Sequence, residues 1–567
     1  MTHTYNMNLT IKITGPAGLG MNSSADIIAH IFADMGYFVT GDNEYQSLIK
    51  GGLNWFDLNI SDTSMTLQRA TDIVIAFNDK NLQNVLPVLK EGGHIIVNKK
   101  FSEKIEGLEK FHVHDLDIQD KYDNTYLLGI LAKLLGLEKD LILNKIAHVF
   151  ERKGEEVVKK NQDIVANIYE TYKIDASNIY NVERIGASRE MYFGNKAVAY
   201  GAIESGLGYY SAYPMTPAST ILSEIVNSKQ VPFLQAEDEI SVINSALGAS
   251  FTGTRSMVGT SGGGFALMTE ALSFAVQAEI PVVAVLSQRA GPSTGTPTFH
   301  EQGDLNFALN PTFGDFHHVV LCPSSLEETY TMSGQALNLA DKYQNPVILL
   351  MDKQSSELHG TIAEKKAAEI ERGKMLDTPP EDYKRYELTD DGISPRVEVG
   401  TVNGDFIATS YEHDEFGATT EEPDMKVKMT EKRFKKLENF FEKEGISGYE
   451  IFTALSPNLS PEGRKELPKK MFITMSFTAY NAKEFVKNNP EYGLIIIKFL
   501  KPLDKRLVKD IEGVQELIFL ESNYSGQLET YLTHELDLHH IDGLTLSRKR
   551  KYDLYPFYME DFEEFKN

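Results

Sequence analysis

The sequence predicts an α/β protein of three domains, with an extended arm between the second and the third. Short apolar runs alternate with stretches of helical periodicity near the start of the chain, again from about residue 185, and again over the last hundred residues. The chain has 567 residues, enough for three or four domains at about 150 residues each. The segment between the second and third alternating regions is rich in charged and turn residues and lacks the alternation.

Residues 1–180 are the first predicted domain, with a Rossmann-type pattern. A candidate strand over residues 9–13 leads into GPAGLG, and a helical stretch follows as far as Met35. The spacing is a variant of the glycine-rich turn that binds dinucleotide phosphates, and a tight strand-to-helix turn that binds nothing explains it equally well. The three glycines of this motif are Gly15, Gly18 and Gly20.

A second glycine pair in the same domain, Gly51 and Gly52, directly follows Lys50. Backbone amides beside a lysine suit a phosphate group. A plain turn is the simpler interpretation of the pair.

Residues 185–365 are the second predicted domain, and chemically useful side chains follow four of its candidate strands. Thr216 follows the first, Glu237 the second, a run of three glycines the third, and Arg289 the fourth. Parallel strands of an open α/β sheet end at one edge, and ligands bind in the crevice outside it. We therefore expect a hydroxyl, a carboxylate, a glycine-lined floor and a guanidinium to meet in one pocket. The floor consists of Gly262, Gly263 and Gly264.

Residues 366–465 form the predicted arm, with one helix expected over residues 430–445. A segment this long without its own core is typical of an extension over other domains or of a subunit interface. Residues 466–567 resume the alternation and predict a small third α/β domain.

Composition excludes several classes of function. The formal net charge of −25 argues against a nucleic-acid partner and against an anionic membrane, because both require basic patches. The single cysteine, Cys322, cannot form an internal disulfide, and an iron–sulfur cluster usually takes about four thiolates, so this chain alone ligates no cluster. The first residues lack the features of a secretory signal, and no apolar run approaches the ~20 residues of a spanning helix. We expect a cytoplasmic protein.

The motifs YPMTP and QAEDEISVINSALGAS resemble the α subunit of 2-oxoacid:ferredoxin oxidoreductases, thiamine diphosphate enzymes that make acyl-CoA from 2-oxoacids. Six further stretches resemble the family in the same order: TSGGGFALMTEALS, QRAGPSTGTPT, EQGDLNFAL, DGISPRVEVG, HDEFG and ESNYSGQL. The amino-terminal region, with GPAGLGM and YQSLIKGG, is similar to the family's γ domain. The resemblance implies a γ–α fusion: a γ domain, a thiamine-pyrimidine-binding domain, the arm, and a domain like the carboxyl-terminal domain of transketolase.

By this resemblance Glu237 is the carboxylate that activates thiamine diphosphate. The chemistry needs one carboxylate in a dry pocket with a raised pKa, because the acid must give a proton to the aminopyrimidine ring of the cofactor. Asp238 and Glu239 add negative charge, which raises a carboxyl pKa, whereas the start of a helix lowers it. The alternative is that all three acids only favour a helix amino terminus.

Arg289 and Thr216 match the residues that contact the substrate in the family. An arginine meets a planar carboxylate with two parallel hydrogen bonds, and the alternative for Arg289 is a salt bridge at a strand end. Threonine before proline is biased toward an extended backbone, which fixes the direction of its hydroxyl. The alternative for Thr216 is a turn residue or a helix cap.

Tyr213, Gly262 and Gly263 are further expected contacts of the cofactor. The family more often has proline where Gly263 stands and isoleucine where Met215 stands, and these departures concern pocket shape and substrate. His300, in PTFHEQGD, is a candidate partner for the distal carboxylate of a dicarboxylic oxoacid, or a structural histidine.

Two features that the resemblance implies are absent from the sequence. No Gly-Asp-Gly turn, which holds the cofactor's diphosphate through magnesium, occurs in it, and it lacks the cysteines of a cluster. In the family both lie on a β subunit. The resemblance thus implies half of an active site, with Mg²⁺ and an iron–sulfur cluster on a β subunit, ferredoxin as electron acceptor, coenzyme A as a substrate that the GPAGLG turn could hold, and a dimer of αβ units.

The substrate implied first is 2-oxoglutarate, because the DGISPR and HDEFG segments of the arm resemble that subgroup. Pyruvate and branched-chain oxoacids are the alternatives. Two other classes of function stay open: a non-catalytic assembly subunit, and a nicotinamide-dependent dehydrogenase built on GPAGLG. The dehydrogenase leaves YPMTP and QAEDE unexplained and lacks a ribose-binding acid at the usual distance.

Overall fold

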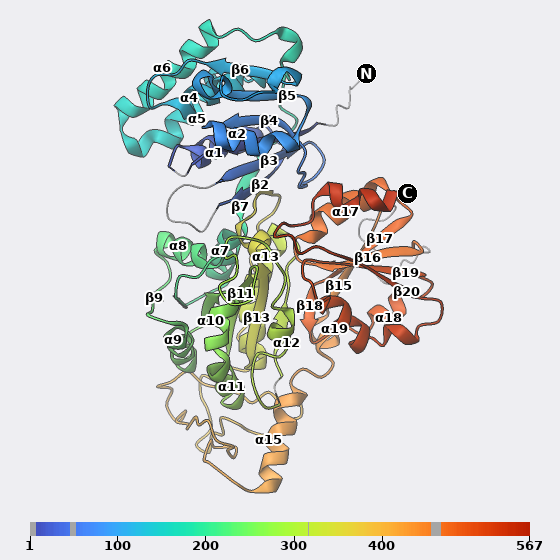
Figure 1. Cartoon of the computed structure of the whole chain (residues 1–567). Coiled ribbons are helices and arrows are strands. Elements are labelled where there is room, and N and C mark those ends of the chain that lie inside the picture. The colour runs from blue at the N-terminus through green and yellow to red at the C-terminus, as the bar shows by residue number, and fades with distance from the viewer. Residues whose placement is uncertain (1–6, 17, 46–52, 316, 455–466, 567) are drawn as a thin grey trace. The chain divides into compact units, whose positions relative to one another are not determined.

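The computed structural model divides the chain into two compact units (Figure 1). The first unit comprises residues 1–192, 358–363 and 558–567, and the second comprises residues 193–357 and 364–557. Both are built from strands and helices, which confirms the predicted α/β class. The structure describes residues 7–16, 18–45, 53–315, 317–454 and 467–566. Lys50, Gly51 and Gly52, the second candidate phosphate turn, lie outside these ranges.

The first unit contains an eight-stranded sheet in the order β6-β5-β4-β1-β3-β2-β14-β7. The strand and the helix predicted around GPAGLG are β1 and α1, and β1 pairs parallel with β4 and antiparallel with β3. The strands are β1 Asn8–Thr14, β2 Phe38–Glu44, β3 Trp55–Ser61, β4 Thr71–Ala76, β5 Leu89–Asn98, β6 His112–Leu116, β7 Glu190–Phe193 and β14 His359–Ile362. The longer helices are α1 Met21–Asp34, α4 Asp123–Leu134, α5 Lys139–Phe150 and α6 Glu155–Thr171.

The second unit contains a seven-stranded sheet in the order β18-β12-β13-β11-β10-β8-β9. All of its pairs are parallel except that of β18 with β12. Every residue of β10, β11 and β13 is buried, as expected for central strands covered on both faces. The strands are β8 Tyr209–Ala212, β9 Phe233–Gln235, β10 Ser256–Thr260, β11 Val282–Gln288, β12 Val319–Leu321, β13 Pro346–Asp352 and β18 Phe499–Lys501. The helices around it include α7 Gly194–Glu204, α8 Ser219–Ser228, α9 Glu239–Phe251, α10 Gly262–Leu267, α11 Thr269–Gln277, α12 Leu305–Leu309 and α13 Leu326–Tyr343.

The last part of the second unit forms a five-stranded sheet in the order β15-β17-β16-β19-β20 (Figure 1). Only β15 runs antiparallel to its neighbour. One apolar core extends from the seven-stranded sheet into this sheet, and β18 pairs with β12 at the edge of the larger sheet. The elements are β15 Tyr449–Thr453, β16 Lys470–Met475, β17 Tyr492–Ile497, β19 Glu516–Glu521, β20 Thr545–Arg550, α17 Thr478–Asn488, α18 Leu507–Asp510 and α19 Gln527–Glu535.

The arm of the second unit is irregular from residue 364 to residue 422, with isolated β-bridges only. The single helix predicted over residues 430–445 is wrong in its bounds, since the structure has two helices, α15 Pro423–Lys435 and α16 Phe440–Glu444. The helix begins earlier because proline fits the first helical position, and it breaks because Asn439 adopts a left-handed backbone with φ of 54°.

Buried ion pairs hold the arm to the rest of the second unit. Glu279, just after α11, accepts from Lys432 at 2.7 Å and pairs with Lys436 at 2.6 Å. All three side chains are almost fully buried. Arm and sheet are therefore joined by charges that water does not reach.

No helix in the described part of the chain has the length and the apolar character needed to cross a bilayer.

Candidate functional site

The four side-chain clusters predicted from the sequence follow four neighbouring strands. In the seven-stranded sheet β11, β10, β8 and β9 lie side by side and run parallel, so their carboxyl ends share one edge. Arg289 follows β11, the glycine run follows β10, Thr216 follows β8 and Glu237 follows β9. The edge formed by these four strand ends, with the first residues of α9 and α10, is called the crevice below.

Arg289 and Thr216 meet in the crevice. The Arg289 Nη1 donates to the backbone carbonyl of Thr216 at 2.7 Å. Partial burial lowers the pKa of the guanidinium, and the nearby carboxylate of Asp304 opposes that effect. The arginine is thus tied to the loop after β8 through its Nη1 atom. Its other nitrogen atoms do not take part in this bond.

Glu237 lies at the surface of the chain. Its carboxylate accepts a hydrogen bond from the Ser241 hydroxyl at 2.5 Å, and this bond lowers its pKa. The role predicted for Glu237 needs a carboxylate in a dry pocket with a raised pKa. In this chain Glu237 meets neither condition.

Glu239 meets both conditions. It is the first residue of α9, and its side chain is buried, with 3% of the residue exposed. Burial raises the pKa of its carboxyl. Its Oε1 atom is buried and accepts no hydrogen bond from the described residues. A buried carboxyl oxygen without a partner is costly, and this oxygen is free to accept a hydrogen bond from a donor bound in the crevice.

The local sequence explains why Glu239 turns inward. Asp238 caps α9 by accepting from the backbone N–H of Ser241 at 2.8 Å, so the helix begins at Glu239. Val242, Ile243 and Ala246 follow at helical spacing and are buried, which puts Glu239 on the same inner face. From the sequence Glu239 was taken only as a neighbour that adds negative charge to Glu237, although this periodicity was the signal that could have identified it.

The glycine run forms the floor of the crevice. A β-carbon on Gly264 would collide with Glu239 Oε1 and with the Thr260 hydroxyl. A β-carbon on Gly262 would lie 2.6 Å from Asp304 Oδ2, whereas one on Gly263 would meet no atom within 4 Å. A side chain at the first or third position would therefore displace a neighbouring side chain, whereas the second position leaves open space.

Asp304 is a second carboxyl near the crevice, and no sequence motif indicated it. Burial and the nearby Glu301 raise its pKa to about 6, and Arg289 opposes the shift. Its backbone N–H donates to Gln288 Oε1 at 2.9 Å, which ties it to the residue before Arg289.

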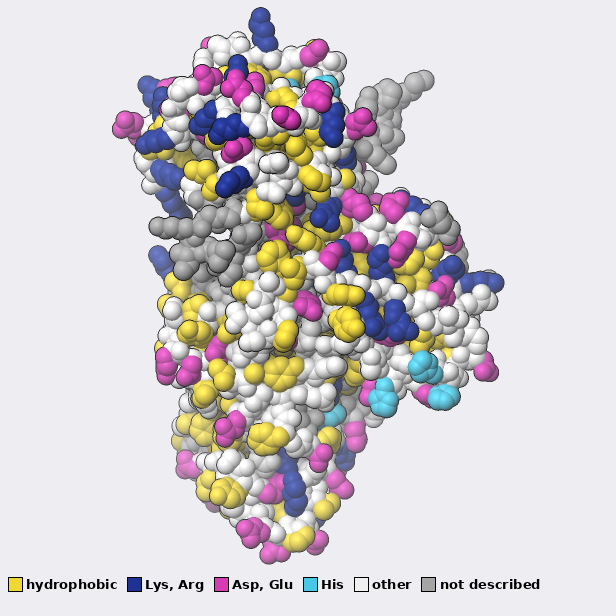
Figure 2. Space-filling model, in the orientation of Figure 1, with side chains coloured by type: hydrophobic (Ala, Val, Ile, Leu, Met, Phe, Trp, Pro, Cys, Tyr) yellow, Lys and Arg dark blue, Asp and Glu magenta, His cyan; other side chains and the backbone are white. Residues whose placement is uncertain are grey.

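Tyr213 follows β8 directly and is 40% exposed. β9 forms the edge of the seven-stranded sheet, and its three residues are exposed. Figure 2 shows hydrophobic side chains at the surface over the part of the second unit that holds these elements. The exposed apolar residues of β8, β9, α9 and α10 and the loops beside them are Tyr213, Phe233, Leu234, Ile240 and Leu267.

His300 lies in the interior. Only 1% of the residue is exposed, and its Nδ1 is 3.9 Å from Asp352 Oδ1. Asp352 also accepts from Gln302 Nε2 at 2.9 Å and from the Ser476 hydroxyl at 2.7 Å. Burial beside Asp352 favours the structural histidine over a contact with a substrate carboxylate.

The glycines of GPAGLG lie in the first unit, between β1 and α1, and are not part of the crevice. Gly18 and Gly20 have φ of 90° and 85°, values that favour glycine. Gly20 caps α1, and Gly15 packs where a β-carbon would lie 2.7 Å from Phe77. This geometry fits both a phosphate-binding turn and a plain turn.

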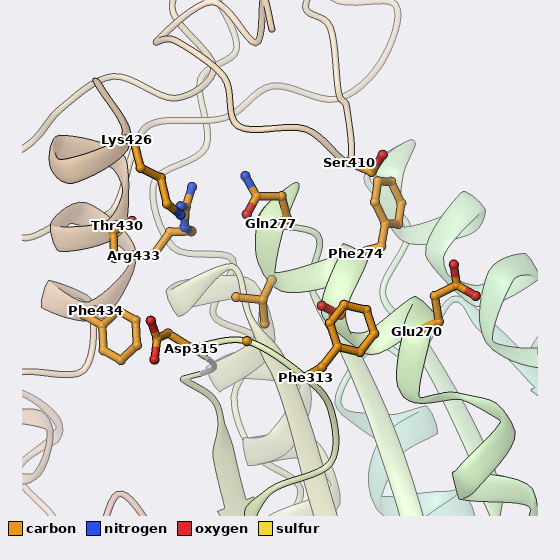
Figure 3. A pocket seen from close by; sticks show the side chains of 13 residues that line it. Glu270, Phe274, Gln277, Phe313, Asp315, Ser410, Lys426, Thr430, Arg433 and Phe434 are labelled. Atoms are coloured by element: carbon orange, nitrogen blue, oxygen red, sulfur yellow. The ribbon is translucent and has the colours of Figure 1, made fainter. Parts of the chain in front are cut away.

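A cavity of about 450 Å³ lies between α11, the loop before β12 and the arm (Figure 3). None of the predicted site residues lines it. Its two cations, Lys426 and Arg433, already pair with Glu412 at 2.9 and 2.8 Å. We therefore place the candidate site in the crevice and not in this cavity.

In the described ranges no group of three or more His, Cys, Asp or Glu residues is placed to hold a metal ion.

Two family models match the chain. Residues 10–171 match the model for pyruvate ferredoxin/flavodoxin oxidoreductase, and residues 200–432 match the one for "pyruvate flavodoxin/ferredoxin oxidoreductase, thiamine diP-bdg". The crevice, from Thr216 to Asp304, lies within the second match.

Three proteins of known name are similar to more than half of the chain. The 2-oxoacid:ferredoxin oxidoreductase subunit alpha of Saccharolobus solfataricus is 31% identical and is matched over 92% of each chain. The 2-oxoglutarate synthase subunit KorA of Methanocaldococcus jannaschii is 32% identical over 54% of this chain and 80% of its own length. The solved 2-oxoglutarate:ferredoxin oxidoreductase of Magnetococcus marinus, with 2-oxoglutarate, coenzyme A and succinyl-CoA bound, is 29% identical, with a TM-score of 0.89 and 99% of each chain covered.

Proposed function

The chain belongs to the 2-oxoacid:ferredoxin oxidoreductases as an α subunit with a thiamine diphosphate-binding domain, and from this premise we propose that its crevice is half of the active site. The reaction is the oxidative decarboxylation of a 2-oxoacid with coenzyme A, which yields acyl-CoA, carbon dioxide and reduced ferredoxin. The observation that carries the proposal is the buried carboxyl of Glu239, whose Oε1 accepts no hydrogen bond from the described residues.

The crevice fits the aminopyrimidine part of thiamine diphosphate. When bound, this cofactor supplies a nucleophilic carbon that takes up the electrons left by decarboxylation. Glu239 holds a proton at Oε1, where burial keeps its carboxyl pKa raised, and a ring nitrogen facing Oε1 would satisfy that atom. Gly264 leaves room for the carboxyl, and Gly263 leaves open space above the floor.

Glu239 replaces Glu237 as the preferred activating acid. A general acid near neutral pH needs a raised pKa, and Glu237 has a lowered one because Ser241 donates to it. Glu237 stays the alternative, because a partner subunit could bury it in the complete enzyme.

Arg289 and Thr216 bind the substrate in this proposal. The guanidinium offers paired N–H donors to the carboxylate of the 2-oxoacid, and its bond to the Thr216 carbonyl at 2.7 Å holds it in the crevice. The Thr216 hydroxyl contacts the substrate, and Tyr213, Gly262 and Gly263 contact the cofactor.

A β subunit completes the site. The sequence contains no Gly-Asp-Gly turn and one cysteine, Cys322, which is buried. We propose that Mg²⁺ for the diphosphate and an iron–sulfur cluster reside on that subunit, which passes electrons to ferredoxin. The exposed apolar residues beside the crevice support a partner there. The assembly is a cytoplasmic dimer of αβ units.

The proposed substrate is 2-oxoglutarate, supported by the names of the relatives from M. jannaschii and M. marinus. Pyruvate and branched-chain oxoacids are the alternatives. Coenzyme A is proposed to bind at the GPAGLG turn, in a γ domain over residues 1–180. The further proposed domains are residues 185–365, the arm over 366–465, and residues 466–567.

The test uses the complex of this chain with a cysteine-rich β subunit that carries Gly-Asp-Gly. Viologen reduction is measured with 2-oxoglutarate or pyruvate and coenzyme A. Glu239→Gln should lower the rate by about 10²–10⁴-fold, while Glu237→Gln, the matched control, stays near the parental rate. A large loss of rate in Glu237→Gln with a parental rate in Glu239→Gln would assign the activating role to Glu237. Parental rates in both variants would refute the proposal.

A further inference from the structure

The loop from β8 to α8 carries Thr216, and hydrogen bonds from two other elements hold its backbone. Arg289, after β11, donates to the Thr216 carbonyl at 2.7 Å. Asn195, on α7, donates through its Nδ2 to the next carbonyl along the chain, that of Pro217, also at 2.7 Å. Two consecutive carbonyls of the loop are thus each fixed by a side chain from elsewhere in the second unit.

The amide of Asn195 also holds the beginning of α8. Its Nδ2 donates to the Thr220 hydroxyl oxygen at 2.7 Å. A carbonyl oxygen such as that of Pro217 can only accept, so the side of the amide that faces it must be the NH2 group. The Oδ1 atom of Asn195 accepts no hydrogen bond from the described residues. The structure therefore uses this side chain as a donor.

Asn195 stands on a helix that is packed tightly from two sides. A β-carbon on Gly194 would lie 1.6 Å from a backbone carbonyl oxygen of α14 (Lys353–Glu357). One on Gly201 would lie 2.0 Å from a backbone carbonyl oxygen of α13. No part of Asn195 is exposed. A donor on a helix with such close neighbours is fixed in place, as the support of a binding site must be.

Resting on the proposed function, we propose that Asn195 is a positioning residue for the oxoacid site. It touches neither the substrate nor the cofactor, and it acts through the loop that it holds. By fixing the Pro217 carbonyl it fixes the peptide of Thr216, to which Arg289 is bonded. The Thr216 hydroxyl and the Arg289 guanidinium, the two groups proposed to bind the oxoacid, are thereby presented together.

Asn195→Leu tests the inference by removing the donor and keeping the approximate shape of the side chain. The complex with the β subunit is loaded with an inert thiazolone analogue of the cofactor. Calorimetry then gives the dissociation constant of the oxoacid that the parental complex oxidises, 2-oxoglutarate or pyruvate. The variant should bind it roughly tenfold more weakly, since a small misplacement of contact groups costs up to about 10²-fold. A parental dissociation constant in the folded variant would overturn the inference.

Steady-state rates separate a displaced contact from a loss of folded enzyme. In the active complex the KM for the oxoacid should rise by the factor seen in calorimetry, while the KM for coenzyme A keeps its parental value. A fall in kcat at an unchanged KM for the oxoacid would mean only that fewer complexes are folded. That result would also overturn the positioning role.

Asn481→Leu is the matched control. Asn481, on α17, is 2% exposed, and its Nδ2 donates to the Phe557 carbonyl at 2.7 Å. The same donor is thus removed at a similar burial, away from the crevice. Urea unfolding should show a loss of stability in both variants, but only Asn195→Leu should change the dissociation constant of the oxoacid. Equal weakening in the two variants would reject a specific role for Asn195.

Thr220→Val decides the question if Asn195→Leu does not fold. Thr220 is exposed, and without its hydroxyl the amide of Asn195 keeps only the bond to Pro217. The dissociation constant of the oxoacid should rise about threefold, less than for the loss of the whole amide, since one neutral hydrogen bond contributes modestly. A parental value in Thr220→Val would then overturn the inference.

A double-mutant cycle with Arg289→Lys distinguishes this inference from the function on which it rests. If Asn195 acts through the bond between Thr216 and Arg289, Asn195→Leu should weaken binding by only about twofold once position 289 is lysine. If Arg289→Lys weakens binding and the factor for Asn195→Leu stays tenfold, the positioning role fails and the proposed function stands. If Arg289→Lys leaves binding unchanged, the proposed role of Arg289 fails, and the positioning role fails with it.

Discussion

Arg289 Nη1 donates to the Thr216 carbonyl oxygen at 2.7 Å, a bond that joins the end of β11 to the loop after β8 across the intervening strand β10. The two residues are 73 positions apart in the sequence. The bond fixes the guanidinium at the strand edge where oxoacids are proposed to bind.

Arg289→Lys should raise the KM for the oxoacid in the reconstituted complex. Lysine cannot supply two parallel donors, and losing one charged hydrogen bond costs roughly 2 kcal/mol, or about 30-fold in kcat/KM. Steady-state rates of viologen reduction measure the effect. Arg506→Lys, at a half-exposed arginine that pairs with the buried Asp504 outside the crevice, is the matched control and should leave the KM unchanged. A parental KM in the Arg289 variant would contradict the proposed contact.

Gly264→Ala should lower stability and activity together. The added methyl group would collide with Glu239 and Thr260, and overpacking of this kind costs about 1–3 kcal/mol. Gly263→Ala is the control for stability in the same helix, since its methyl group meets open space. Urea unfolding measures both variants, and viologen reduction measures Gly264→Ala. Equal effects of the two substitutions would rule out tight packing at position 264.

Asp304→Asn should stabilise the chain at neutral pH. The carboxyl pKa is raised from 3.8 to about 6 on folding, so between these values the folded state holds the proton that the unfolded state has lost. Stability therefore falls as pH rises through this range, and the full penalty, at most about 3 kcal/mol, applies above it. Unfolding free energies of parent and variant should converge at acid pH. A difference that does not change with pH would contradict the assignment.

Glu279→Gln should destabilise the second unit. Lys432 and Lys436, both nearly fully buried, would lose the carboxylate to which they bind, and breaking a buried pair in this way costs about 3–5 kcal/mol. Glu371→Gln, at an exposed pair with Lys342, should cost less than about 1 kcal/mol. Urea unfolding compares the two variants. Equal losses of unfolding free energy in the two variants would show that the buried ion pairs of Glu279 stabilise the chain no more than an exposed pair does.

His300→Ala should lower stability without changing substrate preference. The ring is buried beside Asp352, and loss of a buried polar contact costs about 1–3 kcal/mol. The ratio of kcat/KM for 2-oxoglutarate to that for pyruvate should equal the parental ratio. A ratio that shifts toward pyruvate in a stably folded variant would restore the substrate-binding role.

Local pattern was sufficient to predict the elements that carry the crevice. Buried parallel strands appear as short apolar runs, and polar residues or glycines mark where each one ends. Thr216, the glycine run and Arg289 were found in this way. The two arm helices were predicted as one, because a left-handed residue such as Asn439 interrupts a helix without interrupting the apolar spacing.

Contacts between distant segments could not be predicted in the same way. Glu279 and Lys432 are 153 positions apart and have no pattern in common. Asp304 was not predicted as a site residue for the same reason. Its surroundings include Arg289 and Gly262, which belong to other elements.

By itself the sequence determined the α/β class, the strand ends at which polar residues gather, and the resemblance that led to the family. Only the tertiary structure distinguished the buried carboxyl of Glu239 from the exposed carboxyl of Glu237, and only it showed that His300 is buried. The physical reason is that the pKa of a carboxyl follows its burial and its neighbours. Those are properties of packing between elements, and the spacing of residues along one element does not contain them.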